Sequence, residues 1–318
     1  MIGENIAPNV IEIILSSWRS GTQNQYSSSI RKWFEFCTER SINIVAPTIP
    51  QVLSFLTMIH EDGLSYSSVN TAKSALSSVL DLGTETPLGQ LPIIKRFMKG
   101  VFERRPSFPK HKNIWDVKTV LDFFRKQGLP SELSLKDLSA KVAFLLCLLS
   151  GQRCQTIKLL NIESMQVLEH EYVFFVDQKV KQTRVGFHIE PIRFLEYPSD
   201  KRLCVFTHLN EYIQRTKPIR KSDQLLISYL KPHASISTDT LARWVKNILS
   251  SAGVDTSKFK AHSTRSAATS FAAKQNVNVT DILSAVGWSS EQTFQRFYNR
   301  PDQTDFNFGT VILNSSDL

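Results

Sequence analysis

The sequence predicts a mainly α-helical protein with a small β-sheet, arranged in two domains. The chain has 318 residues, more than one small hydrophobic core uses, so each domain is expected to bury an apolar interior of its own. Apolar residues recur at helical spacing through most of the chain, and one stretch, residues 172–194, is instead rich in β-branched and aromatic residues. Hydrophobic residues make up 42% of the chain and charged residues 21%, as in ordinary globular proteins.

The first predicted domain spans residues 1–102 and is a bundle of about four or five helices. Thr22, Thr48 and Ser65 are expected to cap helix starts, because a side-chain oxygen there satisfies a free backbone N–H. Core packing alone explains the apolar residues, which recur mostly every three or four positions: Val10, Ile14, Trp18, Tyr26, Ile30, Trp33, Phe34, Val52, Phe55, Leu56, Ile59, Val69, Leu76 and Leu80.

Residues 103–113 are predicted to form a basic linker between the domains. The segment contains Pro106 and Pro109 together with arginine, lysine and histidine side chains, a composition typical of an extended connector. This composition has two interpretations. The linker crosses the anionic backbone of a bound polyanion, or it contacts only solvent. The domain boundary is placed here on either interpretation.

The second predicted domain, residues 114–300, begins with two helices. An apolar face over residues 117–124 ends at Gly128, and a more buried one over residues 135–149 ends near Gly151, with Arg153 directly after it.

A β-hairpin follows these helices in the prediction. Residues 172–176 and 186–194 form its strands, and the polar residues 177–185 form a long basic tip. Helices resume at residues 205–216 and 240–250, so the second domain is also mostly helical.

The charge and the cysteines restrict the partners of the chain. A net charge of +9 favours a polyanionic partner, since binding releases condensed counterions. Four widely separated cysteines, Cys37, Cys147, Cys154 and Cys204, indicate neither a disulfide framework nor a zinc site, and they fit a reducing compartment. The longest apolar run, residues 142–149, is too short to span a bilayer, and the N-terminal residues lack the pattern of a signal peptide, so no membrane partner or export step is expected.

His262 and Arg265 are the most informative pair in the sequence. They lie three residues apart at a predicted helix start, which places both side chains on one face. A helix N-terminus offers free N–H groups and positive dipole, so imidazole, guanidinium and backbone together would bind a phosphate. Taken alone, His262 fits a capping or surface histidine equally well.

Tyr298 lies late in a short helix near the end of the chain. Thr280 is expected to cap the preceding helix, which ends at Gly287, and Ser289 or Ser290 to cap the helix that Pro301 stops. Phe294 and Tyr298 are four residues apart, so by spacing alone Tyr298 is one more aromatic residue on a buried stripe.

The order of these motifs resembles the tyrosine recombinases, also called the phage integrase family. The motifs are SGQRCQT around Arg153, a lysine in the hairpin, AHSTRSAATS around His262, and GWSSEQTFQRFYNR around Tyr298. The resemblance covers roughly the whole chain. The wording of the motifs is closer to the recombinases of eukaryotic mobile elements, the Crypton and DIRS-like types, than to bacterial Xer proteins.

The resemblance implies a role for each matching residue. Tyr298 is the nucleophile, Arg153 and Arg265 hold the non-bridging oxygens of the scissile phosphate, and His262 is a hydrogen-bonding or proton-transfer partner. Trp288 stands where many family members have histidine, and its indole N–H can donate a hydrogen bond but cannot act as a base.

At two positions the match to the family is less direct. The hairpin lysine that protonates the leaving 5′-oxygen is Lys181 or Lys179, and Lys181 is chosen because Lys-Gln-Thr-Arg resembles the family's hairpin tip. Thr156 stands three residues after the first arginine, where the family commonly has an acidic residue that supports the site.

By this resemblance the chain is a site-specific recombinase or transposase with chemistry like that of type IB topoisomerases. The resemblance implies that the chain cleaves and rejoins DNA strands through a 3′-phosphotyrosine, with no metal or other cofactor. It also implies that the helical core-binding domain and the catalytic domain form a clamp around double-stranded DNA, and that protomers assemble on DNA as dimers or tetramers that pass through a four-way (Holliday) junction. The tail, residues 301–318, is expected to dock on a neighbouring protomer, and the location is the nucleus in a eukaryote and otherwise the cytoplasm or nucleoid.

Two other functions fit parts of the sequence. One is a catalytically inactive DNA-binding protein on the same fold, and the other is a scaffold of two helical bundles whose basic surface is incidental. A hydrolytic nuclease is disfavoured, because the sequence shows no carboxylate cluster suited to two metal ions.

Overall fold

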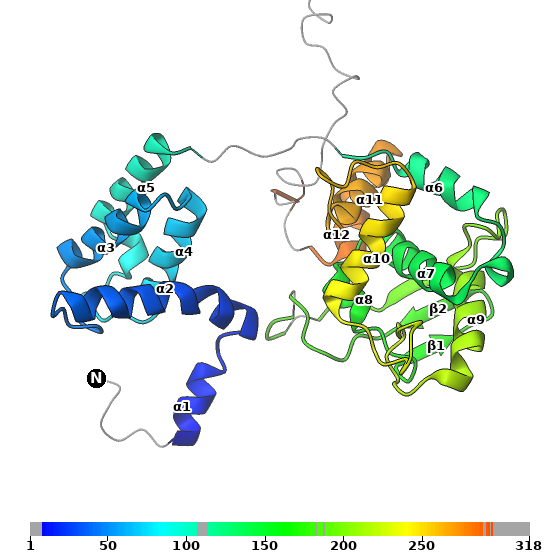
Figure 1. Cartoon of the computed structure of the whole chain (residues 1–318), viewed down its shortest axis with the longest axis horizontal. Helices are drawn as coiled ribbons and strands as arrows, with labels where there is room; N and C mark the ends of the chain where they lie inside the picture. Colours follow the sequence, from blue (N-terminus) through cyan, green and yellow to red (C-terminus); the bar gives the residue numbers. More distant parts are fainter. Residues whose placement is uncertain are drawn as a thin grey trace, which may run out of the picture. The chain divides into compact units, whose positions relative to one another are not determined.

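The structure, a computed structural model, describes residues 8–106, residues 114–288 except Gln182 and Phe187, and residues 291, 292 and 294. The chain divides into two compact units, residues 1–110 and 111–318 (Figure 1). Both units are mainly helical and one small sheet lies in the second, which confirms the predicted fold class. Within the described ranges no helix is both long and apolar enough to cross a membrane.

The first unit is a helical bundle. Trp33 is buried at its centre, with its ring 5.2 Å from that of Phe55, and its indole N–H donates to the carbonyl oxygen of Ile44 at 2.9 Å. The elements are α1 (Pro8–Leu15), α2 (Ser20–Glu39), α3 (Ile49–Glu61), α4 (Tyr66–Ser77), the short 3-10 helix η1 (Leu88–Gln90) and α5 (Pro92–Arg104).

Two of the three predicted caps in this unit are confirmed. Thr48 precedes α3, and its backbone N–H donates to the side chain of Gln51 at 2.8 Å, while Ser65 Oγ accepts from the backbone of Ser68. The prediction for Thr22 is wrong, because the extended backbone lies at Arg19 and α2 begins at Ser20.

Two further expectations for the first unit need correction. Phe34, placed on the buried face by its spacing, is 55% exposed, because α2 packs through Trp33, Phe36 and Cys37. Helix α5 continues to Arg104, so the first two residues of the predicted linker are helical. Of the rest of that linker, Arg105 and Pro106 follow the helix, and residues 107–113 lie outside the described residues.

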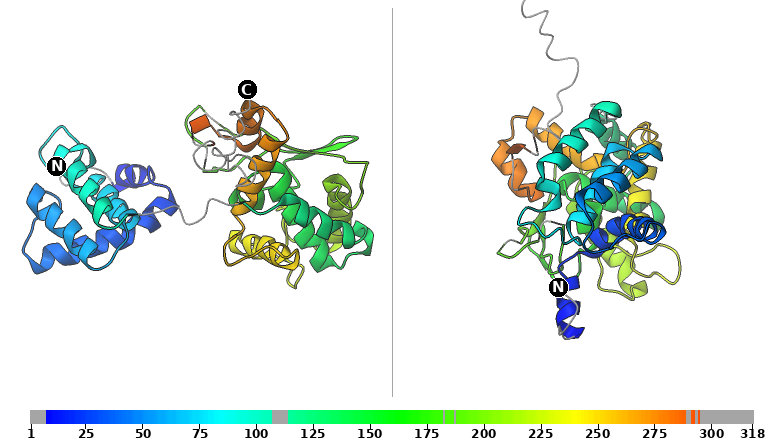
Figure 2. Two further views of the ribbon diagram at one scale, coloured as in Figure 1. Left: turned by 90° about the horizontal axis from the view of Figure 1, so that it is seen from above. Right: turned by 90° about the vertical axis from the view of Figure 1, so that its left-hand side faces the viewer.

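The second unit is built around α7 (Leu135–Ser150), in which eleven of the sixteen residues are buried. Helices α9, α10 and α11 pack against it (Figures 1 and 2). The other helices are α6 (Val117–Lys126), η2 (Pro130–Glu132), α8 (Cys154–Lys158), α9 (Val205–Thr216), η3 (Lys217–Ile219), α10 (Thr238–Ser251), α11 (Ser263–Lys274) and α12 (Val279–Val286).

The predicted pairing of two strands is confirmed and a third strand is added. The antiparallel sheet has the order β1 (Met165–Val167), β2 (Glu171–Phe174), β3 (Ile192–Leu195), with Val173 opposite Arg193. The strands are shorter than predicted, so the loop between β2 and β3 is longer. Strand β1 was missed because it has only three residues, none of them buried, and so leaves no alternating pattern.

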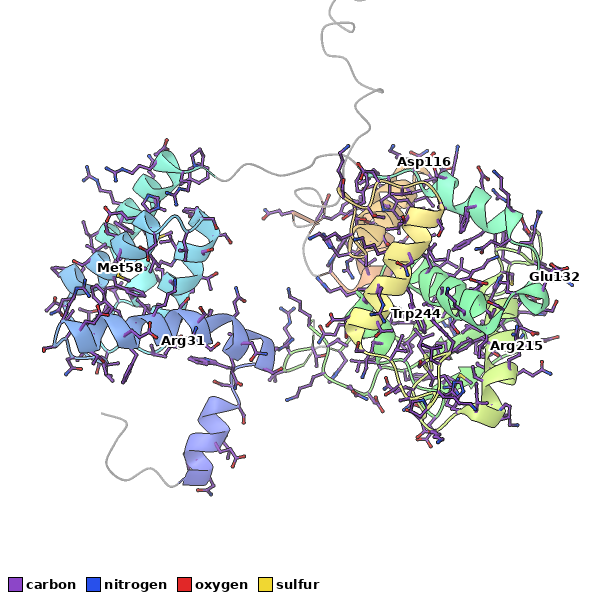
Figure 3. All side chains as sticks on the ribbon, viewed as in Figure 1. Arg31, Met58, Asp116, Glu132, Arg215 and Trp244 are labelled. Atoms are coloured by element: carbon purple, nitrogen blue, oxygen red, sulfur yellow. The ribbon has the colours of Figure 1, made fainter. Side chains whose placement is uncertain are left out.

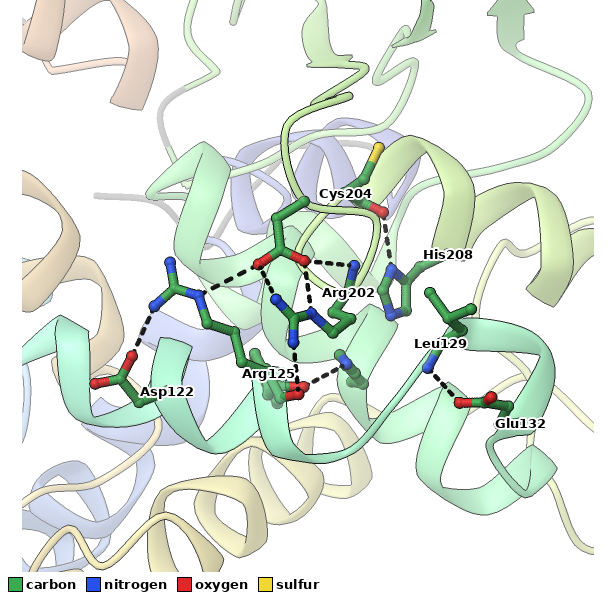
Figure 4. Close-up of polar contacts among 10 residues, drawn as sticks. Asp122, Arg125, Leu129, Glu132, Arg202, Cys204 and His208 are labelled. Atoms are coloured by element: carbon green, nitrogen blue, oxygen red, sulfur yellow. Dashed lines mark hydrogen bonds and ion pairs between the residues drawn. The ribbon is translucent and has the colours of Figure 1, made fainter.

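A cluster of charged and polar groups joins α6, α7 and α9 (Figure 4). Asp200 binds Arg125 and Arg202, and the hydrogen bond from Arg202 lowers the pKa of Asp200 to about 2. Lys141 is fully buried and donates to the carbonyl oxygen of Phe124 at 3.2 Å, and its burial lowers its pKa to about 8. These contacts connect α6 to α7 and to the loop that precedes α9.

Candidate active site

A cavity of about 570 Å³ opens in the second unit where α7, α8, α10 and the start of α11 meet. Its walls carry guanidinium, ammonium and imidazole groups, and no Asp or Glu is among the described lining residues. Such a cavity favours an anion. The lining residues are Cys147, Gln152, Arg153, Cys154, Gln155, Ala242, Arg243, Lys246, Lys260, Ala261, His262, Thr264 and Arg265.

Arg153 reaches the cavity through a tight turn after α7. Gly151 ends the helix in the left-handed conformation with φ of 58°, as its sequence position predicts, and Arg153 then occupies the N-cap position of α8. A Cβ atom on Gly151 would lie 2.6 Å from Val286 Cγ1, so the turn also requires the close approach that only glycine allows. Next to it, Gln152 Nε2 donates to the carbonyl oxygen of Ala285 at 3.1 Å, which ties the turn to α12.

The Arg153 side chain is partly buried, and its Nη1 atom is fully buried. Arg153 Nη1 has no hydrogen-bond partner among the described residues. Because a buried N–H of a charged group is costly to leave unsatisfied, this atom marks a place where an anionic oxygen would bind favourably.

His262 and Arg265 lie together in the same cavity, as their spacing predicts. His262 stands at the N-cap position of α11, and Arg265 one turn later is only 4% exposed. Arg265 Nη2 donates to the carbonyl oxygen of Val286 at 2.9 Å. The end of helix α12 therefore holds the Arg265 guanidinium in place.

Trp288 supports Arg265 and does not line the cavity. The Arg265 guanidinium lies over the indole ring, 4.4 Å from its centroid, and the indole in turn packs on Phe294, with ring centroids 5.8 Å apart. Gly287 ends α12 in the left-handed conformation as predicted, but Asn278 caps its start instead of Thr280, because the Asn278 side chain accepts from the backbone of Thr280.

The structure does not bring the predicted hairpin lysines into the cavity. Lys179 and Lys181 are both exposed in the loop between β2 and β3, on either side of the buried Val180. Tyr298, the predicted nucleophile, lies outside the described residues, as do Ser289, Ser290 and the tail at 301–318. Their roles stay predictions.

Three basic residues of the cavity were missed by sequence reasoning. Arg243 and Lys246 lie three residues apart on α10, and Lys260 precedes the His262 motif by two residues. Trp244, labelled in Figure 3, stacks on Tyr229 with ring centroids 5.4 Å apart and orients α10. The sequence did contain a signal for two of them. The apolar residues of this helix define its buried face, and Arg243 and Lys246 lie together outside that face.

Thr156 is 1% exposed on α8, at the position where the family commonly has an acid. Its backbone N–H donates to the carbonyl oxygen of Arg153 at 2.8 Å. A carboxylate at so buried a position would need a cationic partner of its own, and a threonine needs none.

The fold is that of tyrosine recombinase catalytic domains. The chain aligns with the XerH site-specific recombinase bound to palindromic difH substrate, with a TM-score of 0.58 and 16% identity over 92% of this chain and 79% of that one. It aligns with a lambda integrase (75-356) dimer bound to a COC′ core site, with a TM-score of 0.53 and 16% identity over 94% and 96%. The Tn1549 transposon integrase in complex with transposon right end DNA gives a TM-score of 0.52 and 13% identity over 86% and 85%.

Residues 116–304, more than half of the chain, match the model of the phage integrase family. The chain belongs to this family, as the motifs predicted. No curated protein sequence gives a significant match. The closeness to the Crypton and DIRS-like types stays a prediction.

Proposed function

We propose that the chain is a site-specific DNA recombinase or transposase, in which the cationic cavity binds the scissile phosphate and Tyr298 attacks it. One observation carries this proposal. Arg153 and the pair His262 and Arg265, more than 100 residues apart in the sequence, line one cavity, and the buried Nη1 of Arg153 is still unsatisfied among the described residues.

The cavity suits the transition state of phosphoryl transfer. Negative charge spreads over the phosphate oxygens as the pentavalent species forms, and guanidinium groups match two such oxygens at a time. Hydrogen-bond donors that are already fixed in position around these oxygens each stabilise the transition state by about 3 kcal/mol. The helix that holds Arg265 and the glycine turn that holds Arg153 supply this rigidity.

The proposed step conserves the phosphodiester energy. The phenolic oxygen of Tyr298 forms a bond to phosphorus while the bond from phosphorus to the 5′-oxygen breaks, leaving a 3′-phosphotyrosine. His262 assists loss of the phenolic proton, and Lys181, or else Lys179, gives a proton to the leaving 5′-oxygen. The positive charge that stabilises the phosphate oxygens comes from side chains, so the step as proposed uses no metal ion or other cofactor. A 5′-hydroxyl from a second strand reverses these events and rejoins the DNA.

Double-stranded DNA is the proposed partner. Arg243, Lys246 and Lys260 extend the positive wall beyond the scissile phosphate and would contact neighbouring phosphates. The aligned XerH, lambda integrase and Tn1549 structures contain DNA, and one lambda integrase structure is a tetramer bound to a Holliday junction. By analogy, protomers of this chain assemble on DNA as dimers or tetramers, with the first unit as the core-binding domain and residues 301–318 docking on a neighbour.

Covalent trapping tests the proposal. DNA sites selected from a random pool would be nicked near the cleavage position, so that the released fragment diffuses away and the phosphotyrosine accumulates. We expect a complex that survives denaturant with the wild-type protein and disappears in Tyr298→Phe. Site-specific binding without a covalent complex would instead indicate an inactive DNA-binding protein on this fold, and weak binding with no site preference would indicate a scaffold.

A further inference from the structure

Two of the four cysteines lie in the wall of the cavity beside Arg153. Cys147 is in the last turns of α7 and Cys154 is the first residue of α8, on either side of the turn at Gly151. Cys147 is buried and Cys154 is partly exposed. The other two cysteines, Cys37 in the first unit and Cys204 before α9, are buried and do not line the cavity.

Cys147 and Cys154 lie on the neighbouring helices α7 and α8, and both line the cavity. The interaction between their thiols lowers the pKa of Cys154 and raises the pKa of Cys147. The cavity around Cys154 also contains the cations Arg153, Lys246 and Lys260 and no carboxylate among its described residues. Positive surroundings with partial exposure are the conditions under which a thiolate reacts with peroxides.

We propose that Cys154 and Cys147 form an oxidisable dithiol, and that their disulfide switches off DNA cleavage. The Cys154 thiolate attacks one oxygen of a hydroperoxide, so an S–O bond forms, the O–O bond breaks, and the leaving alkoxide or hydroxide takes up a proton. The Cys147 sulfur then attacks the Cys154 sulfur, the S–S bond forms, and the sulfenic oxygen leaves as water with the Cys147 proton. Two thiols are oxidised, one peroxide is reduced, and a dithiol reductant reverses the change.

Disulfide formation would displace Arg153. Cys147 and Cys154 are free thiols, whereas the two sulfurs of a disulfide lie about 2.05 Å apart, closer than any non-bonded contact, so Cys154 must move toward Cys147 on α7. Arg153 is its neighbour and occupies the N-cap position of the same short helix, and Gly151 leaves little room for adjustment against Val286. A shift of about 1 Å at a group that positions the reacting phosphate costs on the order of 100-fold in rate. This effect on cleavage rests on the proposed function, whereas the disulfide itself does not.

The experiment treats the full-length protein with hydrogen peroxide, alkylates the remaining thiols and maps peptides by mass spectrometry. We expect one disulfide joining Cys147 and Cys154, while Cys37 and Cys204 are alkylated after unfolding. Covalent trapping on the nicked DNA site would fall by roughly 10- to 100-fold and return with dithiothreitol. Cys154→Ser and Cys147→Ala would each lose this sensitivity to peroxide, measured against the reduced form of the same variant, whereas Cys204→Ser would keep it.

Each other outcome identifies what has failed. If peroxide forms no Cys147–Cys154 disulfide, the dithiol is ruled out, and if the disulfide forms but trapping is unchanged, the switch is ruled out. If the reduced protein traps no DNA at all, the proposed function fails, and DNA affinity before and after oxidation becomes the measurement. The switch is then supported only if oxidation weakens binding in the wild type and not in Cys154→Ser, and it is overturned if both bind alike.

Discussion

The guanidinium of Arg265 lies over the indole of Trp288, 4.4 Å from the ring centroid, while its Nη2 donates to the carbonyl oxygen of Val286. Trp288 was expected to donate a hydrogen bond to the phosphate, as histidine does at this position in many family members. Its contact with Arg265 provides a different way to act on the site, because a ring face holds a guanidinium in one plane.

Substitution of Trp288 separates these two roles. Trp288→Ala removes a cation–π contact of about 0.5–2 kcal/mol, so the rate of covalent trapping should fall by about 2- to 30-fold. Trp288→Phe keeps a ring face but has no N–H, so it should retain most of the activity. If Trp288→Phe is as damaged as Trp288→Ala while both melt at similar temperatures, the indole N–H matters and the supporting role is wrong.

Gly151 should be nearly intolerant of a side chain. Gly151→Ala places a methyl group at positive φ and 2.6 Å from Val286 Cγ1, and the combined strain and overlap should lower the free energy of unfolding by about 2–4 kcal/mol. Gly253→Ala is the matched control, because Gly253 also has positive φ but no atom within 4 Å of the added Cβ. Denaturant unfolding of both variants measures the difference, and equal losses would show that the contact with Val286 is unimportant.

The choice between the hairpin lysines is decided by a change of leaving group. Lys181→Ala should slow cleavage by roughly 100- to 10,000-fold, as expected for loss of a general acid. A DNA substrate with sulfur in place of the bridging 5′-oxygen needs no protonation, so it should restore the rate of this variant. Lys179→Ala is the matched control and should cleave both substrates normally. Rescue of Lys179→Ala instead would reverse the assignment, and rescue of neither would remove the hairpin from proton transfer.

The basic pair on α10 should affect DNA binding through phosphates. Arg243→Ala and Lys246→Ala should each weaken binding to all sequences and reduce the slope of log affinity against log salt by about 0.9. Lys217→Ala, which removes an exposed lysine outside the cavity lining, is the control and should leave the slope unchanged. A loss confined to one DNA sequence would show that these residues contact bases.

Local rules in the sequence predicted much of this site. A glycine after an apolar helix predicted the left-handed turns at Gly151 and Gly287, and a spacing of three residues placed His262 and Arg265 together. Each of these features depends on neighbours within one or two helical turns. For the same reason the mainly helical class was predictable from apolar spacing alone.

Features that depend on distant contacts were not predictable in this way. Nothing local shows that Arg243 and Lys246 on α10 face Arg153, because their meeting depends on how α10 packs on α7 and α8. Trp288 was similarly assigned to the phosphate, because its contact with Arg265 joins α11 to the residue that follows the end of α12. That Cys147 and Cys154 line the same cavity escaped notice because a turn, not a motif, brings them together.

The stability of the second unit should fall between pH 6.5 and pH 4 because of His208. His208 is fully buried on α9, its Nδ1 donates to the carbonyl oxygen of Cys204 at 2.8 Å, and burial lowers its pKa from 6.5 to about 4. The unfolded chain therefore takes up a proton near pH 6.5 and the folded chain only near pH 4. The contribution of neutral His208 to the free energy of unfolding is complete above pH 6.5 and is lost as the pH falls to 4, a change of about 3 kcal/mol.

Hydrogen exchange of α9 peptides in urea at pH 7, 6, 5 and 4 measures this loss, after correction for the intrinsic exchange rate at each pH. His208→Asn keeps an N–H near the Cys204 carbonyl but does not titrate, so it should start less stable and show a flatter dependence on pH. Asp200 and Asp255, whose pKa values are both lowered to about 2 by hydrogen bonds from neighbouring residues, lose their contribution only below pH 3.8, outside this range. An unchanged slope in His208→Asn would place the acid sensitivity of the unit elsewhere.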